Sequence, residues 1–209
     1  MSKVDFKLYF ITNRLLSDSN RFYEVIKKAC YAGVKAIQLR EKNLTTVELY
    51  RMAEDIIKIC SQTKTILFIN DRLDVANAVQ AGGIHLTSRS LPITAIRNQI
   101  RNQMLVGIST HSLNEVRRAE ENSCDFVLFG PVFDTPEKRQ YGQPQGLNRL
   151  ADVCRNCSIP VFAVGGINYE KVKSCLDCGA YGVAVISAIM KSHNVDYAIN
   201  QFKEELGCL

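Results

Sequence analysis

The sequence has no long apolar segment and no low-complexity linker. A membrane-spanning helix needs about 20 consecutive apolar residues, whereas the hydrophobic 46% of this chain falls into short runs. The first residues, Met1 to Asp5, include an early acid and lack the apolar core of a secretory signal peptide. We therefore expect a cytoplasmic protein without a membrane partner, folded as one domain over residues 1–209.

Long basic runs are absent as well, and positive charge exceeds negative charge only mildly. Lysine and arginine together number 26 against 21 acidic residues, which gives a net charge of +5. The basic residues are scattered and are not interleaved with aromatic residues, as they would be on a nucleic-acid-binding surface. The charge therefore argues against nucleic acid as a partner and suits small phosphorylated molecules.

The eight cysteines do not indicate a secreted, disulfide-rich protein. Most lie within apolar helical patterns, where a reduced cysteine behaves as a small hydrophobic residue. Two CxxC pairs, Cys154 with Cys157 and Cys175 with Cys178, have the spacing of a structural zinc site. The apolar segment Pro160–Gly166 between them argues against a compact zinc knuckle, and zinc stays an alternative.

Short apolar runs rich in β-branched residues alternate with amphipathic stretches along the chain. Eight such runs predict parallel strands that are covered on both faces, and the short connections favour a single closed (β/α)₈ TIM barrel over an open doubly wound sheet. The predicted strands are Leu8–Thr12, Ala36–Arg40, Ile66–Asn70, Gly83–Leu86, Leu105–Ser109, Phe126–Gly130, Pro160–Gly166 and Tyr181–Ser187.

Helices are predicted at 20–32, 45–61, 112–122 and 169–178. Thr45 with Glu48, and Ser112 with Glu115, have the spacing of a capping box at a helix start. Glycines follow two of these helices, at 33 and 179, where a left-handed C-terminal cap is expected.

The second predicted strand delivers polar residues to its carboxyl end, where a parallel barrel places its active site. Alternation directs Gln38 and Arg40 to the same inward side and leaves Lys42 at the rim. A guanidinium and an ammonium at the mouth of a barrel suit a phosphate or a pyrophosphate. The alternative is an ordinary solvated cluster of charge.

The third strand ends in Asn70 and Asp71, where a carboxylate could hold Mg²⁺ beside a diphosphate. Asp71 could equally cap the following helix. Histidines follow the fourth and fifth strands, but neither has a carboxylate or a cysteine at a catalytic spacing. We therefore interpret His85 as structural and keep His111 only as a residue of the site wall.

The longest irregular segment, Pro131–Gly146, lies between the sixth strand and its helix, and so long a loop in a small domain is usually functional or mobile. It offers the Thr135 hydroxyl and the Lys138 ammonium to a phosphate, unless it is an ordinary proline-rich turn. Backbone N–H groups after the seventh and eighth strands, near Gly166 and Ser187, predict the phosphate site that such barrels place there.

Seven motifs occur in order along the chain: Gln38-Leu39-Arg40-Glu41-Lys42, Asn70-Asp71-Arg72, Gly83-Ile84-His85-Leu86, Gly107-Ile108-Ser109-Thr110-His111, Gly130-Pro131-Val132-Phe133-Asp134-Thr135, Gly165-Gly166-Ile167 and Val185-Ile186-Ser187-Ala188-Ile189. Together they resemble the successive motifs of the thiamine phosphate synthase family. They cover the chain from Leu8 to about Ile189, and the set is specific although no single motif is.

The resemblance implies a transferase that couples hydroxymethylpyrimidine diphosphate to hydroxyethylthiazole phosphate and releases pyrophosphate, in thiamine biosynthesis. In that family the pyrimidine C–O bond ionises first, and the thiazole nitrogen then attacks the cation. The resemblance also suggests a homo-oligomer, and it implies that Asp71 binds Mg²⁺. The side chains implied to act on the departing pyrophosphate or at the reacting centre are Arg40, Lys42, Asn70, Ser109 and Lys138. Those implied to bind the substrates are Gln38 at the pyrimidine, Thr135 on the pyrophosphate side, and Gly166, Ile186 and Ser187 at the thiazole phosphate.

Two departures from the family pattern concern charge. Ser90 stands where the family usually has a second acidic metal ligand, and Glu137 replaces a hydroxyl beside Lys138. These losses leave two alternatives: a TenI-like thiazole tautomerase, or a non-catalytic barrel that binds a thiamine precursor. The tautomerase is less favoured, because Pro131 stands in place of its histidine and proline cannot transfer protons.

Overall fold

The computed structural model describes residues 4–100, 103–135 and 143–208. Eight parallel strands close into a barrel in chain order, and β8 pairs with β1. The predicted (β/α)₈ TIM barrel is confirmed, and each predicted strand overlaps an observed one, although β5 extends one residue beyond its prediction, to Thr110. The strands are β1 (Leu8–Ile11), β2 (Ala36–Leu39), β3 (Ile66–Asn70), β4 (Gly83–Leu86), β5 (Leu105–Thr110), β6 (Phe126–Phe129), β7 (Val161–Val164) and β8 (Gly182–Val185).

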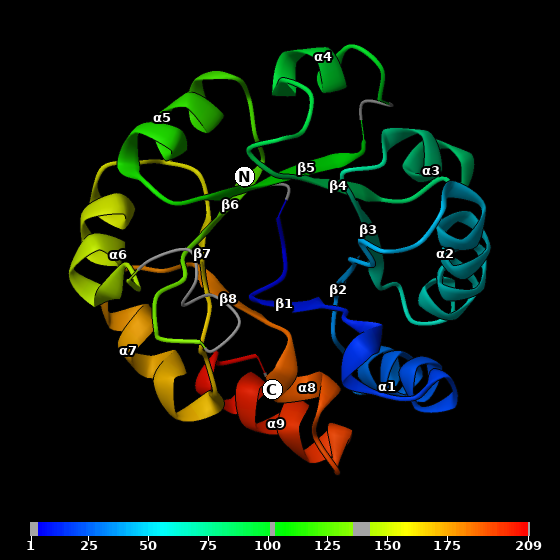
Figure 1. The fold of residues 1–209 in the computed structure, drawn as a ribbon. Coiled ribbons are helices and arrows are strands. Elements are labelled where there is room, and N and C mark those ends of the chain that lie inside the picture. Colours follow the sequence, from blue (N-terminus) through cyan, green and yellow to red (C-terminus); the bar gives the residue numbers. More distant parts are fainter. Residues whose placement is uncertain (1–3, 101–102, 136–142, 209) are drawn as a thin grey trace.

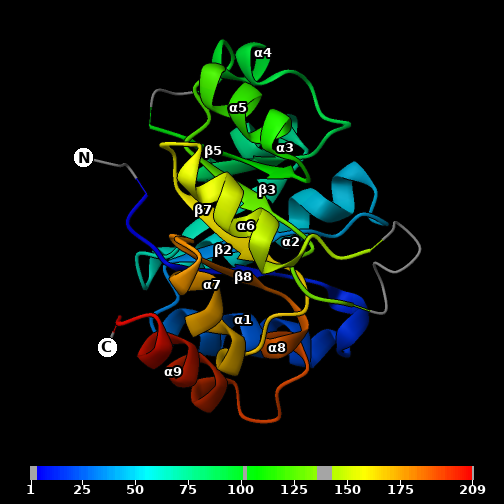
Figure 2. The same ribbon diagram turned by 90° about the vertical axis from the view of Figure 1, so that its left-hand side faces the viewer.

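Helices form an outer ring around the strands (Figure 1). None of the helices in the described part of the chain has the length and apolar character that a membrane span requires. The segment that leads into β1 enters from the left of Figure 2, where the chain also ends after its last helix. The helices are η1 (Arg14–Leu16), α1 (Ser19–Tyr31), α2 (Thr46–Ser61), α3 (Leu73–Ala78), α4 (Ile93–Arg97), α5 (Leu113–Glu121), α6 (Gly146–Arg155), η3 (Tyr169–Lys171), α7 (Val172–Asp177), α8 (Ser187–Met190) and α9 (Val195–Glu205).

The helix-end signals are confirmed with one correction. Thr45 and Glu48 form a complete capping box at the start of α2, and both predicted cap glycines have positive φ, 89° at position 33 and 90° at position 179. Ser112 accepts the Glu115 N–H at the start of α5, but the Glu115 carboxylate accepts the N–H of His111, one residue too early for a capping box. The second capping box is therefore only half formed.

Aromatic rings fill the amino-terminal half of the barrel. Phe6 precedes β1, and its ring centroid lies 5.3–5.8 Å from those of Tyr9, Phe68, Phe126 and Phe162. These rings belong to an interior cluster that is separate from the core between strands and helices. Because this half of the barrel is packed solid, ligands are confined to the half formed by the carboxyl ends of the strands.

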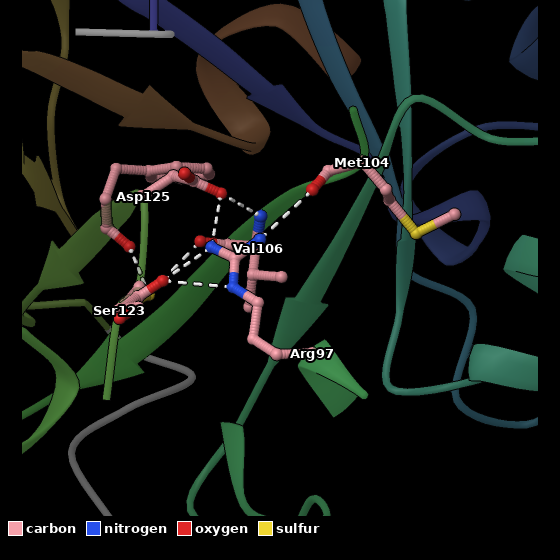
Figure 3. A network of polar contacts seen from close by, with 7 residues as sticks. Arg97, Met104, Val106, Ser123 and Asp125 are labelled. Atoms are coloured by element: carbon pink, nitrogen blue, oxygen red, sulfur yellow. Dashed lines mark hydrogen bonds and ion pairs between the residues drawn. The ribbon is translucent and has the colours of Figure 1, made fainter. Parts of the chain in front are cut away.

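An ion pair closes the amino-terminal end of β5 and β6 (Figure 3). Arg97 donates to Asp125 Oδ2 at 2.6 Å, to the Met104 carbonyl at 3.2 Å and to the Ser123 carbonyl at 2.6 and 3.0 Å. The same Asp125 oxygen accepts the Val106 N–H at 2.7 Å. One guanidinium thus ties α4 to the entrances of two neighbouring strands.

The two CxxC pairs lie near the contact between α6 and α7. Burial is the main cause that raises the pKa of Cys154 and of Cys175 to about 12, which disfavours the thiolate that a zinc site needs. Among the described residues, no group of three or more His, Cys, Asp or Glu side chains is arranged to hold a metal ion. The zinc alternative therefore has no support in this structure, and these cysteines serve helix packing.

Candidate functional site

The register of the strands brings four polar side chains to the mouth of the barrel. Gln38 on β2 pairs with Phe68, Asn70 on β3 pairs with His85 on β4, and Ser109 is the last residue but one of β5. Side chains alternate between the two faces of a strand, and Phe68, two residues before Asn70, belongs to the interior cluster. Gln38, Asn70, His85 and Ser109 therefore point into the barrel, above the aromatic rings.

Several buried polar atoms at this mouth have no hydrogen-bond partner within the described part of the chain. Three belong to predicted site residues: Gln38 Nε2, Asn70 Oδ1 and Thr135 Oγ1. Leaving a buried polar group unsatisfied costs about 1–3 kcal/mol, so native proteins rarely do so without a partner such as water or a ligand. These atoms mark the surface on which a polar ligand fits.

His85 is a site residue that the sequence interpretation missed. It is 1% exposed, and its Nε2 lies 3.0 Å from Ser109 Oγ. Burial, and after it the positive charge of Arg40, lower the pKa of His85 to about 3. The imidazole is therefore neutral at physiological pH and orients Ser109. The charge of Arg40 therefore acts on the inward-facing His85.

Arg40 and Lys42 follow β2 at the rim. Arg40 is half-buried and Lys42 is exposed, and both take part in polar or electrostatic contacts. Glu41 between them is buried and bonds to the end of β1. The sequence shows only an acid between two basic residues at the end of a strand. The burial of Glu41 is evident only in the structure.

Asp71 adopts the left-handed conformation, with φ of 63°, and its N–H donates to the His85 carbonyl at 2.9 Å. The N-cap of α3 is Arg72, and no side chain caps that helix. The alternative that Asp71 only caps the helix is therefore wrong, because the turn places Asp71 one residue too early. Aspartate adopts this conformation more readily than most residues other than glycine, and here the conformation separates the Asp71 carboxylate from the start of α3.

Asp71 and Ser90 line one pocket of about 540 Å³ beside the barrel mouth. Asp74 also lines it, but its carboxylate pairs with Arg72, and Ser90 Oγ accepts the Thr87 N–H at 2.8 Å. Asp71 thus supplies a carboxylate at the rim. Mg²⁺ is commonly held by one or two carboxylates together with substrate phosphates, so this donor set fits a magnesium ion that a diphosphate helps to bind.

The opposite side of the mouth is built from backbone. Gly165 and Gly166 have φ of 99° and 67°, so β7 ends earlier than predicted. A Cβ on Gly166 would lie 2.7 Å from the Asp134 carbonyl oxygen, so only glycine lets the two loops approach. Lys171, which the sequence interpretation also missed, donates to the Gly166 carbonyl at 2.8 Å and lies over the Phe133 ring.

The remaining predicted residues divide into three cases. Ile186 is the N-cap of α8, and the exposed Ser187 is its first residue, so both follow β8 next to the β7 loop. His111, in the connection between β5 and α5, is exposed, and its Nδ1 bonds to the Gly130 carbonyl, so it contacts the loop after β6. Lys138 and Glu137 lie outside the described residues.

The chain is similar to known proteins over most of its length. A family model described as thiamine monophosphate synthase matches residues 8–189. A thiamine-phosphate synthase of Clostridium botulinum is 33% identical over 98% of this chain and 95% of its own, and one of Clostridium beijerinckii is 34% identical over 97% of each. The solved structure of a thiamine phosphate pyrophosphorylase from Pyrococcus furiosus is 33% identical, has a TM-score of 0.88 and covers 98% of this chain and 97% of that one. The chain therefore belongs to the thiamine monophosphate synthase family.

Proposed function

We propose that this protein is a thiamine-phosphate synthase, a transferase that couples hydroxymethylpyrimidine diphosphate to hydroxyethylthiazole phosphate and releases pyrophosphate. The observation that carries the proposal is the set of buried, unpartnered polar atoms of Gln38, Asn70 and Thr135 at one barrel mouth. The family relatives with this name support the same reaction. We further propose that the protein works in the cytoplasm as a homo-oligomer, without nucleic acid or membrane as a partner.

The reaction needs stabilisation of negative charge more than transfer of protons. As the pyrimidine C–O bond breaks, charge develops on the departing pyrophosphate, and Arg40, Lys42 and Asn70 are proposed to stabilise it through preorganised positive charge and hydrogen bonds. His85, with a pKa of about 3, is neutral at physiological pH and does not act as a general acid there. Its part is to orient the Ser109 hydroxyl toward the leaving-group region.

The two substrates occupy different sides of the mouth in this proposal. Gln38 and Ser109 hold the pyrimidine on the side of β2 and β5, and Thr135 approaches its diphosphate from the β6 loop. Lys138, outside the described residues, is proposed to act on the same diphosphate. The backbone at Gly166, with Ile186 and Ser187, holds the thiazole phosphate, since open N–H groups suit an anion. Asp71 would hold Mg²⁺, which when bound neutralises charge on the pyrophosphate.

A single assay with both substrates tests the proposal against its alternatives. Pyrophosphate release that requires both substrates supports the synthase. Conversion of the thiazole tautomer without pyrophosphate release identifies a TenI-like tautomerase, and binding without turnover identifies a non-catalytic barrel. The same assay tests the role of Arg40. Arg40→Ala should release pyrophosphate roughly 100-fold more slowly, the size expected for the loss of one preorganised charge donor. Equal activity of Arg40→Ala and the unmodified protein would contradict the proposed role of Arg40.

A further inference from the structure

Glu41 lies between two proposed pyrophosphate-binding residues but turns away from the ligand. Its side chain is almost fully enclosed, at 8% exposed. Glu41 Oε1 accepts the Thr12 hydroxyl at 2.7 Å. The Arg14 N–H lies 3.0 Å from Oε1 and 3.1 Å from Oε2, and the Arg14 guanidinium is 3.9 Å from Oε2. The carboxylate therefore fastens the end of β2 to the loop after β1.

Thr12 is the junction of this contact and is fully buried. Its hydroxyl donates to Glu41 and accepts the Arg40 N–H at 3.1 Å. Its own N–H donates to the Gln38 carbonyl at 2.9 Å. The bond to the Gln38 carbonyl belongs to the β1–β2 pairing, in which Ile11 pairs with Gln38. The hydroxyl adds a bond to the Arg40 backbone that strand pairing does not supply.

Burying this carboxylate is costly. Burial raises the pKa of Glu41, whereas the Thr12 and Arg14 hydrogen bonds and the charges of Arg14 and Arg40 oppose that rise. A buried ion pair is often no more stabilising than apolar side chains of the same volume. Stability alone therefore does not account for an acid at this position, whereas a fixed geometry for its two cationic neighbours does.

We propose that Glu41 and Thr12 are positioning residues that set Arg40 and Lys42 against the pyrophosphate of the substrate. They do not touch the ligand; they fix the backbone that carries the residues that do. The inference rests on the proposed function, since it assigns the contact of Glu41 with Thr12 and Arg14 to the diphosphate side of the site. We expect a smaller effect on the thiazole phosphate, proposed to bind at the loops after β7 and β8, because the bonds of Thr12 and Glu41 go to the ends of β1 and β2.

The test compares Thr12→Val, which keeps the shape and removes the hydroxyl, with Thr12→Ser, which keeps the hydroxyl. Thr12→Val should lower kcat/KM for the pyrimidine diphosphate about tenfold and weaken binding of inorganic pyrophosphate, measured by calorimetry with Mg²⁺, by a similar factor. The KM for the thiazole phosphate should change less than twofold. Thr12→Ser should recover most of the loss.

The matched control is Thr65→Val, at the opposite end of the barrel. Thr65 is 7% exposed, and its hydroxyl donates to the Val34 carbonyl at 2.9 Å. This variant loses the same kind of buried bond, so its stability should fall while its kinetic constants stay those of the unmodified protein. If Thr12→Val does not fold, Glu41→Gln is used in its place, because the amide keeps one acceptor oxygen but confronts a donor N–H with an NH₂ group.

Equal losses toward both substrates, or none toward pyrophosphate, would overturn the positioning role. A kinetic change in Thr65→Val as large as that in Thr12→Val would also overturn it, because the effect would then follow from lost stability. These outcomes differ from failure of the proposed function, in which the unmodified protein itself releases no pyrophosphate. In that case calorimetry of Thr12→Val and the unmodified protein with inorganic pyrophosphate still decides whether Thr12 and Glu41 position an anion site.

Discussion

His85 Nε2 lies 3.0 Å from Ser109 Oγ, which joins a fully enclosed imidazole on β4 to a proposed active-site hydroxyl on β5. A neutral imidazole has one donor and one acceptor nitrogen, so this contact restricts the direction of the serine O–H. The environment of His85 can be tested by measuring stability against pH, because burial lowers the pKa of His85 far below its usual value.

The acid stability of the protein should depend on His85. Its pKa of about 3 in the folded chain is below the value near 6.5 of an unfolded histidine. The unfolded state therefore binds the proton first, so this stability is present above about pH 6.5 and is lost as the pH falls toward 3. Between pH 7 and pH 4 the loss amounts to about 3 kcal/mol.

Urea unfolding at pH 7 and pH 4 measures this loss. His85→Gln should lose less stability than the unmodified protein over that range. The exposed His193→Gln variant serves as the control and should follow the unmodified protein. Identical pH dependence in His85→Gln would show that His85 is not the titrating group.

Asp71→Ala should lower pyrophosphate release at least tenfold, which corresponds to about 1.4 kcal/mol of transition-state stabilisation. The reason is the loss of the proposed magnesium ligand at the rim. Asp74→Ala is the matched control, because Asp74 lines the same pocket but pairs with Arg72. A coupled pyrophosphate assay over a range of Mg²⁺ concentrations makes the measurement, and unchanged turnover in Asp71→Ala would remove it as a metal ligand.

Ser90→Asp should restore a second carboxylate to the pocket that Asp71 lines. Two carboxylates bind a divalent cation more tightly than one, because each adds attraction for the metal. The Mg²⁺ concentration for half-maximal activity should therefore fall, by roughly tenfold for about 1.4 kcal/mol of added binding. Ser88→Asp, on the same connection, provides the comparison, and an equal shift in both variants would point to net charge alone.

Arg97→Ala should destabilise the fold without changing the chemistry. The variant leaves the partly buried Asp125 carboxylate without its ion pair and removes bonds to two carbonyl groups. We expect a loss of roughly 2 kcal/mol, less than for a fully buried pair because both side chains keep some exposure. Urea unfolding measures it, with the exposed pair variant Lys173→Ala expected to change by under about 0.5 kcal/mol. A fall in kcat/KM at temperatures where Arg97→Ala is fully folded would contradict a purely structural role.

The strands and much of the site follow from the sequence because both depend on short-range patterns. Apolar runs identify strands, and alternation alone places Gln38 and Arg40 on one face. His85 was misjudged because its partner, Ser109, is distant in the chain and becomes a neighbour only when β4 and β5 pair. The role of Glu41 was hidden for the same reason, since Thr12 and Arg14 become its neighbours only when β1 and β2 pair.

The choice between a metal ligand and a helix cap at Asp71 was open for a different reason. Residue type and spacing fit both, and the backbone excludes the helix cap, because a left-handed turn at Asp71 places the start of α3 at Leu73. The metal ligand stays a proposal. A torsion angle of this kind is an outcome of the whole fold, in which the Asp71 N–H finds the His85 carbonyl.

The cluster of aromatic rings around Phe6 and Phe68 separates the packed end of the barrel from the end that is proposed to bind ligands. The aromatic rings fill the amino-terminal end of the barrel, and the proposed ligand-binding residues lie at the carboxyl end. A substitution at the carboxyl end, such as serine for the usual acid at position 90, therefore alters ligand binding and leaves the aromatic cluster unchanged.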